Sequence, residues 1–446
     1  MTVTRTDSAL YTRPAELLQH LIRFDTTNPP GAEAACIAYI QELLTAAGIP
    51  SAIFAHDPAR PNLLARLPGR GAAPPLLLQG HVDVVTTADQ TWQHPPFGGE
   101  IHDGYVWGRG ALDMKGGVAM MIAAVLRAQA TDTPPPGDVL LLVVSDEEAF
   151  GIEGAGYLIR DHADRFAGVR FALGEFGGFP LRLAGQVFYP IMVAEKQSCR
   201  VRATVRGSGG HAAWPQRGGA MAQLGALLGR LDGARLPVHV TPVVERMIAA
   251  MVPALPAALG GPLTALLDPA QTDTVLVAGG PLGALFDTLL HNTVSPTIVA
   301  GGEATNVHPS RIQLELDGRT LPGYGPHELE SELRALVGAG VEWDVTGADA
   351  GPAAPDLGLF PTLAAVIREA DPSAIPIPYM LPAVTDGRYF ARLGIQTYGF
   401  LPMNLPADFD FQATIHAADE RIPVAALEFG AAAIYQVLQR FGEAHA

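Results

Sequence analysis

Residues 76–85 (LLLQGHVDVV) and residues 108–117 (GRGALDMKGG) decide how this chain folds and where its chemistry lies. The first segment predicts a short apolar strand that ends in His81 and Asp83. Residues two apart along a strand point to the same side, so Asp83 can accept from the imidazole N–H of His81 that a metal does not use. The second segment places Asp113 between glycines, where backbone can approach closely. A histidine and a carboxylate from neighbouring loops indicate half of a metal site.

The composition describes a large and acidic chain. Its 446 residues exceed the size at which a single core keeps growing, so we expect two domains. A net charge of −16 argues against nucleic acid and anionic membrane surfaces as partners. Cys36 and Cys199 match no disulfide or metal framework, which favours a reducing cytoplasm, and residues 1–11 lack the apolar core of a signal peptide.

One apolar segment is long enough to span a bilayer. Residues 247–267 contain no charged side chain. The segment is rich in alanine and is interrupted by Pro253, Pro256 and Pro262, which are costly inside a helix. We therefore expect buried or cleft-lining helices here and no transmembrane helix.

Apolar strands alternate with amphipathic helices before residue 198. The continuous apolar run at 139–144 is typical of a central strand that is covered on both faces. This alternation predicts an α/β domain whose central mixed sheet is largely parallel. Ligands at such sheets bind beyond the carboxyl ends of the strands. Four candidate side chains directly follow predicted strands: His81, Glu147, Glu148 and Glu175.

The pattern changes at about residue 198. Half-exposed alternating strands then surround helices, which predicts an α+β lid domain at 198–350, inserted into a catalytic domain formed by 1–197 and 351–446. The insertion contains a long apolar segment at 237–290, rich in proline, alanine and glycine. The chain therefore returns to the catalytic domain before it reaches His416.

The candidate side chains match the ligands of a two-metal site. Such sites hold two divalent ions about 3.5–4 Å apart through a shared carboxylate. Asp113 would bridge, with His81 and Glu175 on one ion and Glu148 and His416 on the other. Mixed histidine and carboxylate ligation suits zinc, with cobalt or manganese as replacements. Glu147 would then take the proton of a metal-bound water, which favours amide hydrolysis. Each feature alone is also typical of solvated loops.

Eight motifs, in order along the chain, resemble the M20 family of metallopeptidases. This group of co-catalytic zinc amidohydrolases contains aminoacylases, carboxypeptidase S and desuccinylases. The motifs are residues 28–31 (NPPG), 80–85 (GHVDVV), 108–116 (GRGALDMKG), 146–148 (DEE), 174–175 (GE), 209–211 (GGH), 306–307 (NV) with 317–319 (DGR), and the terminal His416. The resemblance implies the metal ligands proposed above. It also implies that Asp83 orients His81, that Glu147 is the general acid and base, and that the peptide after Asp113 is cis.

The resemblance extends to substrate contacts. It implies that His211 of the lid binds the substrate carbonyl and stabilises the oxyanion, often across a homodimer formed through the lid domain. Asn306, Arg319 and Arg388 would recognise the substrate carboxylate, for which a guanidinium fork is well suited. The chain departs from the family at Ala212, where serine is usual, and at 382–385 (PAVT), where Gly-Gly-Thr is usual.

These features predict a zinc-dependent hydrolase that cleaves the amide bond of N-acyl amino acids or small peptides with a free carboxylate. Basic residues are scarce around the lid segment, which favours an apolar acyl or side-chain group over succinyl. A dipeptidase or aminopeptidase on the same scaffold is the alternative within enzymes. A catalytically silent binding module is the alternative outside them, and it is disfavoured because the chain keeps every ligand.

Overall fold

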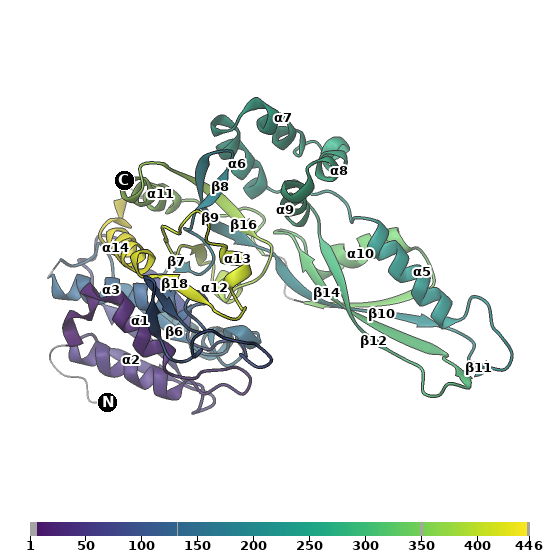
Figure 1. The fold of residues 1–446 in the computed structure, drawn as a ribbon, viewed down its shortest axis with the longest axis horizontal. Helices are drawn as coiled ribbons and strands as arrows, with labels where there is room; N and C mark the ends of the chain where they lie inside the picture. Colours follow the sequence, from purple (N-terminus) through teal and green to yellow (C-terminus); the bar gives the residue numbers. More distant parts are fainter. Residues whose placement is uncertain (1–6, 132, 348–350, 444–446) are drawn as a thin grey trace. The chain divides into compact units, whose positions relative to one another are not determined.

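The chain divides into two compact units in a computed structural model, which describes residues 7–131, 133–347 and 351–443 (Figure 1). Unit 1 consists of Met1–Val193, Asp356–Tyr379 and Thr385–Ala446, and unit 2 of Ala194–Pro355 and Met380–Val384. The sequence placed the first boundary after residue 197, a few residues beyond this division. The second predicted boundary, at residue 350, lies outside the described residues.

Unit 1 is built on a mixed sheet with the strand order β1-β2-β6-β3-β7-β17-β9-β16, and β8 pairs with β9. The centre is parallel, since β3 pairs in parallel with β6 and β7, and β17 with β7. The flanking pairs β1–β2, β2–β6 and β17–β9 are antiparallel. The strands are β1 (Ser51–Phe54), β2 (Asn62–Leu67), β3 (Leu76–His81), β6 (Val139–Val144), β7 (Phe171–Gly174), β8 (Leu181–Leu183), β9 (Gln186–Glu195), β16 (Ala374–Leu381) and β17 (Gln396–Gly399). The predicted α/β class with a central mixed sheet is confirmed, and the parallel pairs are those among the central strands β6, β3, β7 and β17.

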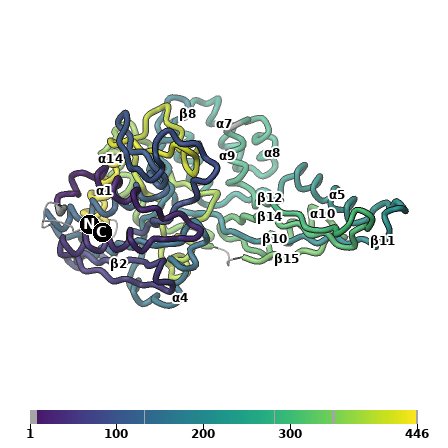
Figure 2. Tube along the Cα trace, turned by 60° about the horizontal axis from the view of Figure 1, so that its bottom comes forward, coloured from purple at the N-terminus to yellow at the C-terminus, as the bar shows by residue number. Residues whose placement is uncertain are grey.

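Helices cover both faces of this sheet, which explains why every residue of β3 and β6 is buried. On one face α3 (Lys115–Ala130) lies under Gly80 and packs against α1 (Pro14–Ile22) and α14 (Val424–Arg440). On the other face Leu77 packs into a cluster with α4 (Ala155–Asp161) and α12 (Gly387–Ala391). Figure 2 shows α1 and α14 on one side of the unit and α4 on the other. The remaining helices of unit 1 are η1 (Asp7–Thr12), α2 (Ala34–Ala46), η2 (Glu147–Ala149), η3 (Ala163–Phe166), α11 (Phe360–Ala370) and α13 (Phe411–Thr414).

A small second sheet joins the two sequence halves of unit 1. It has the order β18-β5-β4, with β4 at Glu100–His102, β5 at Tyr105–Trp107 and β18 at Arg421–Pro423. Arg421 of β18 pairs with Trp107 of β5. From the sequence alone residues 86–108 are expected to form a loop, because they show no continuous apolar run, so β4 and β5 escape prediction. The pairing of β18 with β5 brings the segment around His416 beside residues 108–113.

Unit 2 contains an antiparallel four-stranded sheet with the order β12-β14-β10-β15. The helices α5 (Ala220–Gly233) and α10 (Pro326–Val337) pack on this sheet over a core that includes Val201, Leu314 and Leu333 (Figures 1 and 2). A separate ribbon pairs β11 (Gly210–His211) with β13 (Val307–His308). The four strands of the sheet are β10 (Gln197–Arg206), β12 (Thr293–Ala300), β14 (Arg311–Thr320) and β15 (Val341–Gly347).

The apolar segment 237–290 forms a cluster of short helices within unit 2 (Figure 1). They are α6 (Pro242–Met251), η4 (Val252–Ala254), α7 (Ala257–Ala265), α8 (Pro269–Ala278) and α9 (Gly280–Leu290). Each break falls at or near a proline, as the sequence indicates. Across the described residues, no helix combines the length and the apolar character needed to cross a membrane.

Candidate active site

One group of potential metal ligands lies at the carboxyl ends of β3 and β7. His81 is the last residue of β3, and Glu175 directly follows β7. Nε2 of His81 is 3.1 Å from Oδ1 of Asp113 and 3.5 Å from Oε2 of Glu175. All three side chains are buried. These three side chains lie together at the carboxyl ends of two neighbouring strands, where they form one half of a candidate dinuclear centre.

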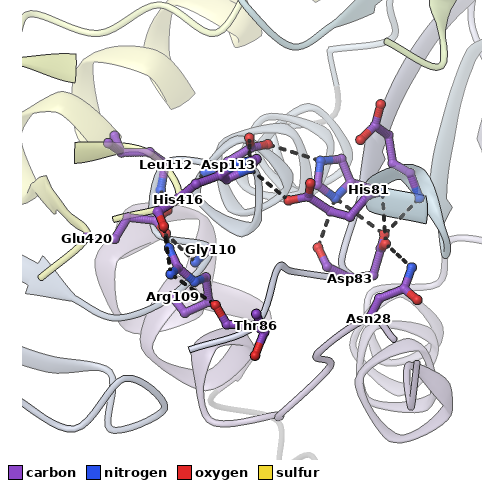
Figure 3. A network of polar contacts seen from close by, with 12 residues as sticks. Asn28, His81, Asp83, Thr86, Arg109, Gly110, Leu112, Asp113, His416 and Glu420 are labelled. Atoms are coloured by element: carbon purple, nitrogen blue, oxygen red, sulfur yellow. Dashed lines mark hydrogen bonds and ion pairs between the residues drawn. The ribbon is translucent and has the colours of Figure 1, made fainter. Parts of the chain in front are cut away.

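A second group shares Asp113 with the first. Nε2 of His416 is 3.1 Å from Oδ2 of Asp113 and 3.2 Å from Oε1 of Glu148. Each oxygen of Asp113 therefore faces a different histidine, as Figure 3 shows for His81 and His416. A carboxylate divided in this way has the geometry of a bridge between two ions. The peptide bond between Asp113 and Met114 is cis, as the family resemblance implies.

Asp83 connects the first histidine to the segment that carries the two glutamates. Nδ1 of His81 lies 2.9 Å from the main-chain oxygen of Asp83 and 3.4 Å from its Oδ1. The Asp83 carboxylate accepts from the backbone N–H of Glu147 and of Glu148, both at 3.1 Å, and from the amide of Asn28 at 2.8 Å. Asp83 thus orients His81 mainly through its carbonyl, and its carboxylate fixes the glutamates. Because β3 ends at His81, strand alternation is not the cause of this arrangement.

Glu147 is the first residue of η2 and belongs to neither ligand group among the described residues. Burial and the charge of Glu175 hold the pKa of the Glu147 carboxyl well above its usual range. A carboxyl group with a raised pKa can accept a proton near neutral pH and release it again.

The electrostatics of the ligands fit two divalent cations. Hydrogen bonds with Asp113 and Glu148 raise the pKa of His416 to about 10, and burial raises the pKa of Glu175 to about 8. Oε2 of Glu175 is buried and has no hydrogen-bond partner among the described residues. Burial penalises an uncompensated carboxylate, so this concentration of carboxylates requires positive charge. The donor set, two imidazoles with carboxylates, is one that zinc prefers.

A small apolar cavity adjoins the ligands. Asp113 and Glu175 contribute to its wall, and its other lining residues are all apolar: Leu112, Phe176, Phe179, Leu401, Met403, Phe411 and Ile415. The rings of Phe179 and Phe411 stack at 4.2 Å between centroids. The cavity has a volume of about 10 Å³, so only a methyl-sized group enters without side-chain movement. None of the described residues that line it is a lysine or an arginine.

Arg388 lies on α12 and contacts the loop that follows Glu147 and Glu148. Its Nη2 donates to the carbonyl oxygen of Phe150 at 2.9 Å, and the hydroxyl of Tyr389 donates to the same oxygen at 2.6 Å. The neighbouring Asp386 is buried, and burial raises its pKa to about 6. Arg388 therefore supports the loop after Glu148.

The remaining predicted residues belong to unit 2. His211 is exposed at the end of β11, and Asn306 immediately precedes β13, the strand that pairs with β11. The carbonyl oxygen of Asn306 accepts from the N–H of Ala212 at 2.9 Å. Arg319 lies on β14, where its Nη2 donates to Asp317 at 2.9 Å. The structure thus brings His211 and Asn306 onto one ribbon and places Arg319 on the sheet.

Sequence reasoning missed Arg109 and Glu420. Both side chains are buried, and Nη1 of Arg109 donates to Oε2 of Glu420 at 2.7 Å (Figure 3). Arg109 lies inside the motif at 108–116, and Glu420 lies four residues after His416. A charged residue in a glycine-rich or polar segment carries no periodic signal, so only the fold reveals that the two meet.

Comparison with known proteins agrees with this geometry. The family model for peptidase family M20/M25/M40 matches residues 77–440. A succinyl-diaminopimelate desuccinylase of Halorhodospira halophila is 27% identical over 432 residues, which cover 95% of this chain and 97% of the relative. Among solved structures, the M20 family metallo-carboxypeptidase Sso-CP2 from Sulfolobus solfataricus aligns with a TM-score of 0.71 at 15% identity, covering 96% of this chain and 99% of that one. The Bacillus subtilis YXEP protein, a dinuclear metal-binding M20 peptidase, aligns with a TM-score of 0.59 at 13% identity over 97% and 99% of the two chains.

The fold and the clustered ligands define a metal-dependent amidohydrolase. The chain belongs to peptidase family M20/M25/M40, because the family model covers most of its length, including the ligands on both sides of unit 2. The family assignment that the eight motifs predicted is confirmed.

Proposed function

We propose that the chain is a dinuclear metalloenzyme that hydrolyses the amide bond of N-acyl amino acids or small peptides with a free carboxylate. The observation that carries the proposal is the division of Asp113 between two histidines, with Oδ1 toward His81 and Oδ2 toward His416. His81 and Glu175 complete one metal position, and Glu148 and His416 complete the other. Zinc suits these donors best, with cobalt or manganese as replacements.

Bound divalent ions at such a centre lower the pKa of a water molecule and polarise the amide carbonyl. Glu147 takes a proton from the water as its oxygen attacks the carbonyl carbon. Glu147 then delivers that proton to the amide nitrogen, so the C–N bond breaks and the products are a carboxylic acid and an amine. The raised pKa of Glu147 supports this role, because the same group must hold and release a proton.

The substrate carboxylate and oxyanion require donors beyond the metal ligands. We assign stabilisation of the oxyanion to His211, and recognition of the carboxylate to Asn306, Arg319 and Arg388. Arg388 is supported by its place beside the loop that carries Glu147. A homodimer through unit 2 would let His211 act on the partner's site. We further propose that the substrate is a small molecule, that neither nucleic acid nor a membrane is a partner, and that the protein is cytoplasmic. The acidic net charge and the two isolated cysteines support these proposals.

The acyl or side-chain group of the substrate is proposed to be apolar. Apolar side chains surround the cavity beside Asp113 and Glu175, and no described lining residue could pair with a second carboxylate. A succinyl group placed there would bury an unpaired charge, which is costly. The relative from Halorhodospira halophila is a desuccinylase. Rates with N-succinyl substrates and with apolar N-acyl substrates must therefore be compared to decide which acyl group this chain accepts.

A substrate panel tests the proposal. The protein is stripped with a chelator, reloaded with zinc, and assayed with N-acetyl, longer N-acyl and N-succinyl amino acids and with dipeptides. We expect zinc-dependent release of the free amino acid, fastest with apolar acyl groups. Equal rates with and without zinc would contradict the mechanism. Activity confined to substrates with a free amino terminus would identify the dipeptidase or aminopeptidase alternative. A protein that binds no stoichiometric zinc would identify the silent binding module.

A further inference from the structure

Arg109 and Glu420 form a buried ion pair beside the ligand cluster. The side chain of Arg109 is 1% exposed and that of Glu420 is fully buried. A buried pair costs desolvation that its mutual attraction only partly recovers, unless further hydrogen bonds satisfy both groups. Both groups in fact make several further hydrogen bonds, and these contacts lead to the metal ligands.

The carboxylate of Glu420 holds the backbone that carries Asp113. Oε1 accepts from the N–H of Leu112 at 2.8 Å and from the N–H of Asp113 itself at 3.2 Å. Oε2 accepts from the N–H of Gly110 at 3.1 Å (Figure 3). The main-chain oxygen of Glu420 accepts from Gly108 at 2.9 Å. One side chain thus fixes the whole turn that presents the bridging carboxylate.

The guanidinium of Arg109 holds the backbone that carries His416. Nη2 donates to the carbonyl oxygen of His416 at 3.1 Å, and Nη1 to that of Ala417 at 3.1 Å. Gln90 reinforces this contact: its Oε1 accepts from Nη2 of Arg109 at 2.7 Å, and its Nε2 donates to the His416 carbonyl at 2.9 Å. Each member of the pair therefore contacts the segment that carries the other, and together they connect Asp113 to His416.

His416 depends on such support more than the other ligands do. Its φ of 60° lies in the left-handed region, which is unfavourable for a side chain other than glycine and persists only where the surroundings impose it. Its side chain is also 48% exposed, whereas that of His81 is 1% exposed. His81 is held by β3 and Asp83, and Glu175 by β7, without any contact from Arg109 or Glu420 among the described residues.

We propose that Arg109 and Glu420 are positioning residues that hold Asp113 and His416 at bridging distance and thereby set the affinity of the metal position formed by Asp113, Glu148 and His416. The inference rests on the proposed dinuclear site. The position formed by His81, Asp113 and Glu175 keeps its two other ligands on independent strands. Weakening the pair therefore lowers metal affinity unequally at the two positions.

Metal titration of the metal-free full-length protein tests this asymmetry. Zinc is titrated calorimetrically into wild type, Glu420→Gln and Arg109→Lys, and bound zinc is counted after dialysis. We expect wild type to bind two zinc ions, and each variant to bind one of them about 10–100-fold less tightly, while the affinity for the other, which shares only Asp113 with the weakened position, falls by much less. The matched control is the surface pair Arg440 and Glu369, with Nη1 at 2.8 Å from Oε1; Arg440→Lys and Glu369→Gln should leave both affinities unchanged.

The outcomes separate this inference from the proposed function. If wild type holds no stoichiometric zinc, the dinuclear site itself is wrong. If wild type holds two ions and the variants bind both with wild-type affinity, or lose both equally, the positioning role is wrong. Should the two variants fail to fold, Gln90→Ala replaces them, since it removes one contact to Arg109 and one to His416. It should weaken mainly the same position; affinities unchanged from wild type, or lowered equally at both positions, would overturn the inference.

Discussion

Oδ2 of Asp113 lies 3.1 Å from Nε2 of His416, and the two residues stand on opposite sides of unit 2 in the sequence. The second metal position therefore exists only when both sequence halves of unit 1 have folded together. β18, which follows His416, pairs with β5, which precedes Asp113, and so fixes the approach of the two segments. Assembly of the site is in this way coupled to completion of the catalytic unit.

Removal of Asp113 and removal of His416 should have different consequences for metal content. Asp113→Ala removes a ligand from both groups, so we expect the purified protein to lose both ions. His416→Ala removes a ligand from one group only, and we expect it to retain about one ion per chain. Elemental analysis after dialysis measures both. Retention of two ions by Asp113→Ala would show that it is not the bridge.

Glu147→Gln should separate catalysis from metal binding. Glu147 belongs to neither ligand group among the described residues, so the variant should keep both ions. Without a group that can take and deliver a proton, kcat should fall by roughly 10²–10⁴-fold. Glu153→Gln, in the same loop and paired with His56, serves as the control and should keep wild-type activity. Full activity of Glu147→Gln would remove this residue from the mechanism.

Metal affinity should rise with pH. Hydrogen bonds with Asp113 and Glu148 raise the pKa of His416 from 6.5 to about 10, so the metal-free protein carries this imidazole protonated at pH 7. The resulting ion pairs stabilise the metal-free fold fully below pH 6.5 and are lost as the pH rises through about 10. A metal ion must displace this proton. Calorimetry in buffers of different protonation enthalpy should detect proton release; metal binding that releases no proton and is independent of pH would contradict the site.

Substrate preference should depend on the stacked rings beside the ligands. Phe411→Ala removes one wall of the apolar cavity and the partner of Phe179. We expect kcat/KM for N-acetyl substrates, whose methyl group has the size that the cavity admits, to fall by roughly tenfold or more, with a smaller change for long apolar N-acyl groups. Phe409→Ala is the control, because Phe409 stacks on Tyr105 and does not line the cavity. Equal losses for all acyl groups would place the acyl chain elsewhere.

Much of unit 1 could be predicted from local pattern. The helix at Pro14–Ile22 and the strands at Asn62–Leu67, Val139–Val144 and Phe171–Gly174 have bounds that can be read from the sequence. These elements have strong apolar periodicity or continuous apolar runs between clear turn residues. Because the strands Val139–Val144 and Phe171–Gly174 precede candidate ligands, the rule for carboxyl ends of parallel strands was sufficient to collect these candidates.

Strands that contain proline escaped prediction. Pro190 lies within β9, Pro296 within β12, and Pro376 and Pro378 within β16. Proline argues against a central strand because it cannot donate to the ladder. β12 and β16 are in fact the outermost strands of their sheets, where one row of backbone groups needs no partner. The sheet order thus explains the prolines of β12 and β16.

The support around the ligands could not be read from the sequence either. Glu420 acts on backbone N–H groups, which every residue possesses, so no residue type at 110–113 announces the contact. Asp83 orients His81 chiefly through its carbonyl oxygen, which likewise has no sequence signature. Side-chain chemistry identifies the ligands, whereas their placement depends on backbone contacts between distant segments.

The central claim is tested most directly by anomalous X-ray diffraction from crystals of the zinc-loaded protein, recorded on both sides of the zinc absorption edge. The account predicts two zinc peaks about 3.5–4 Å apart, with the Asp113 carboxylate between them, His81 on one and His416 on the other. A single peak, or two peaks that do not share Asp113, would contradict it.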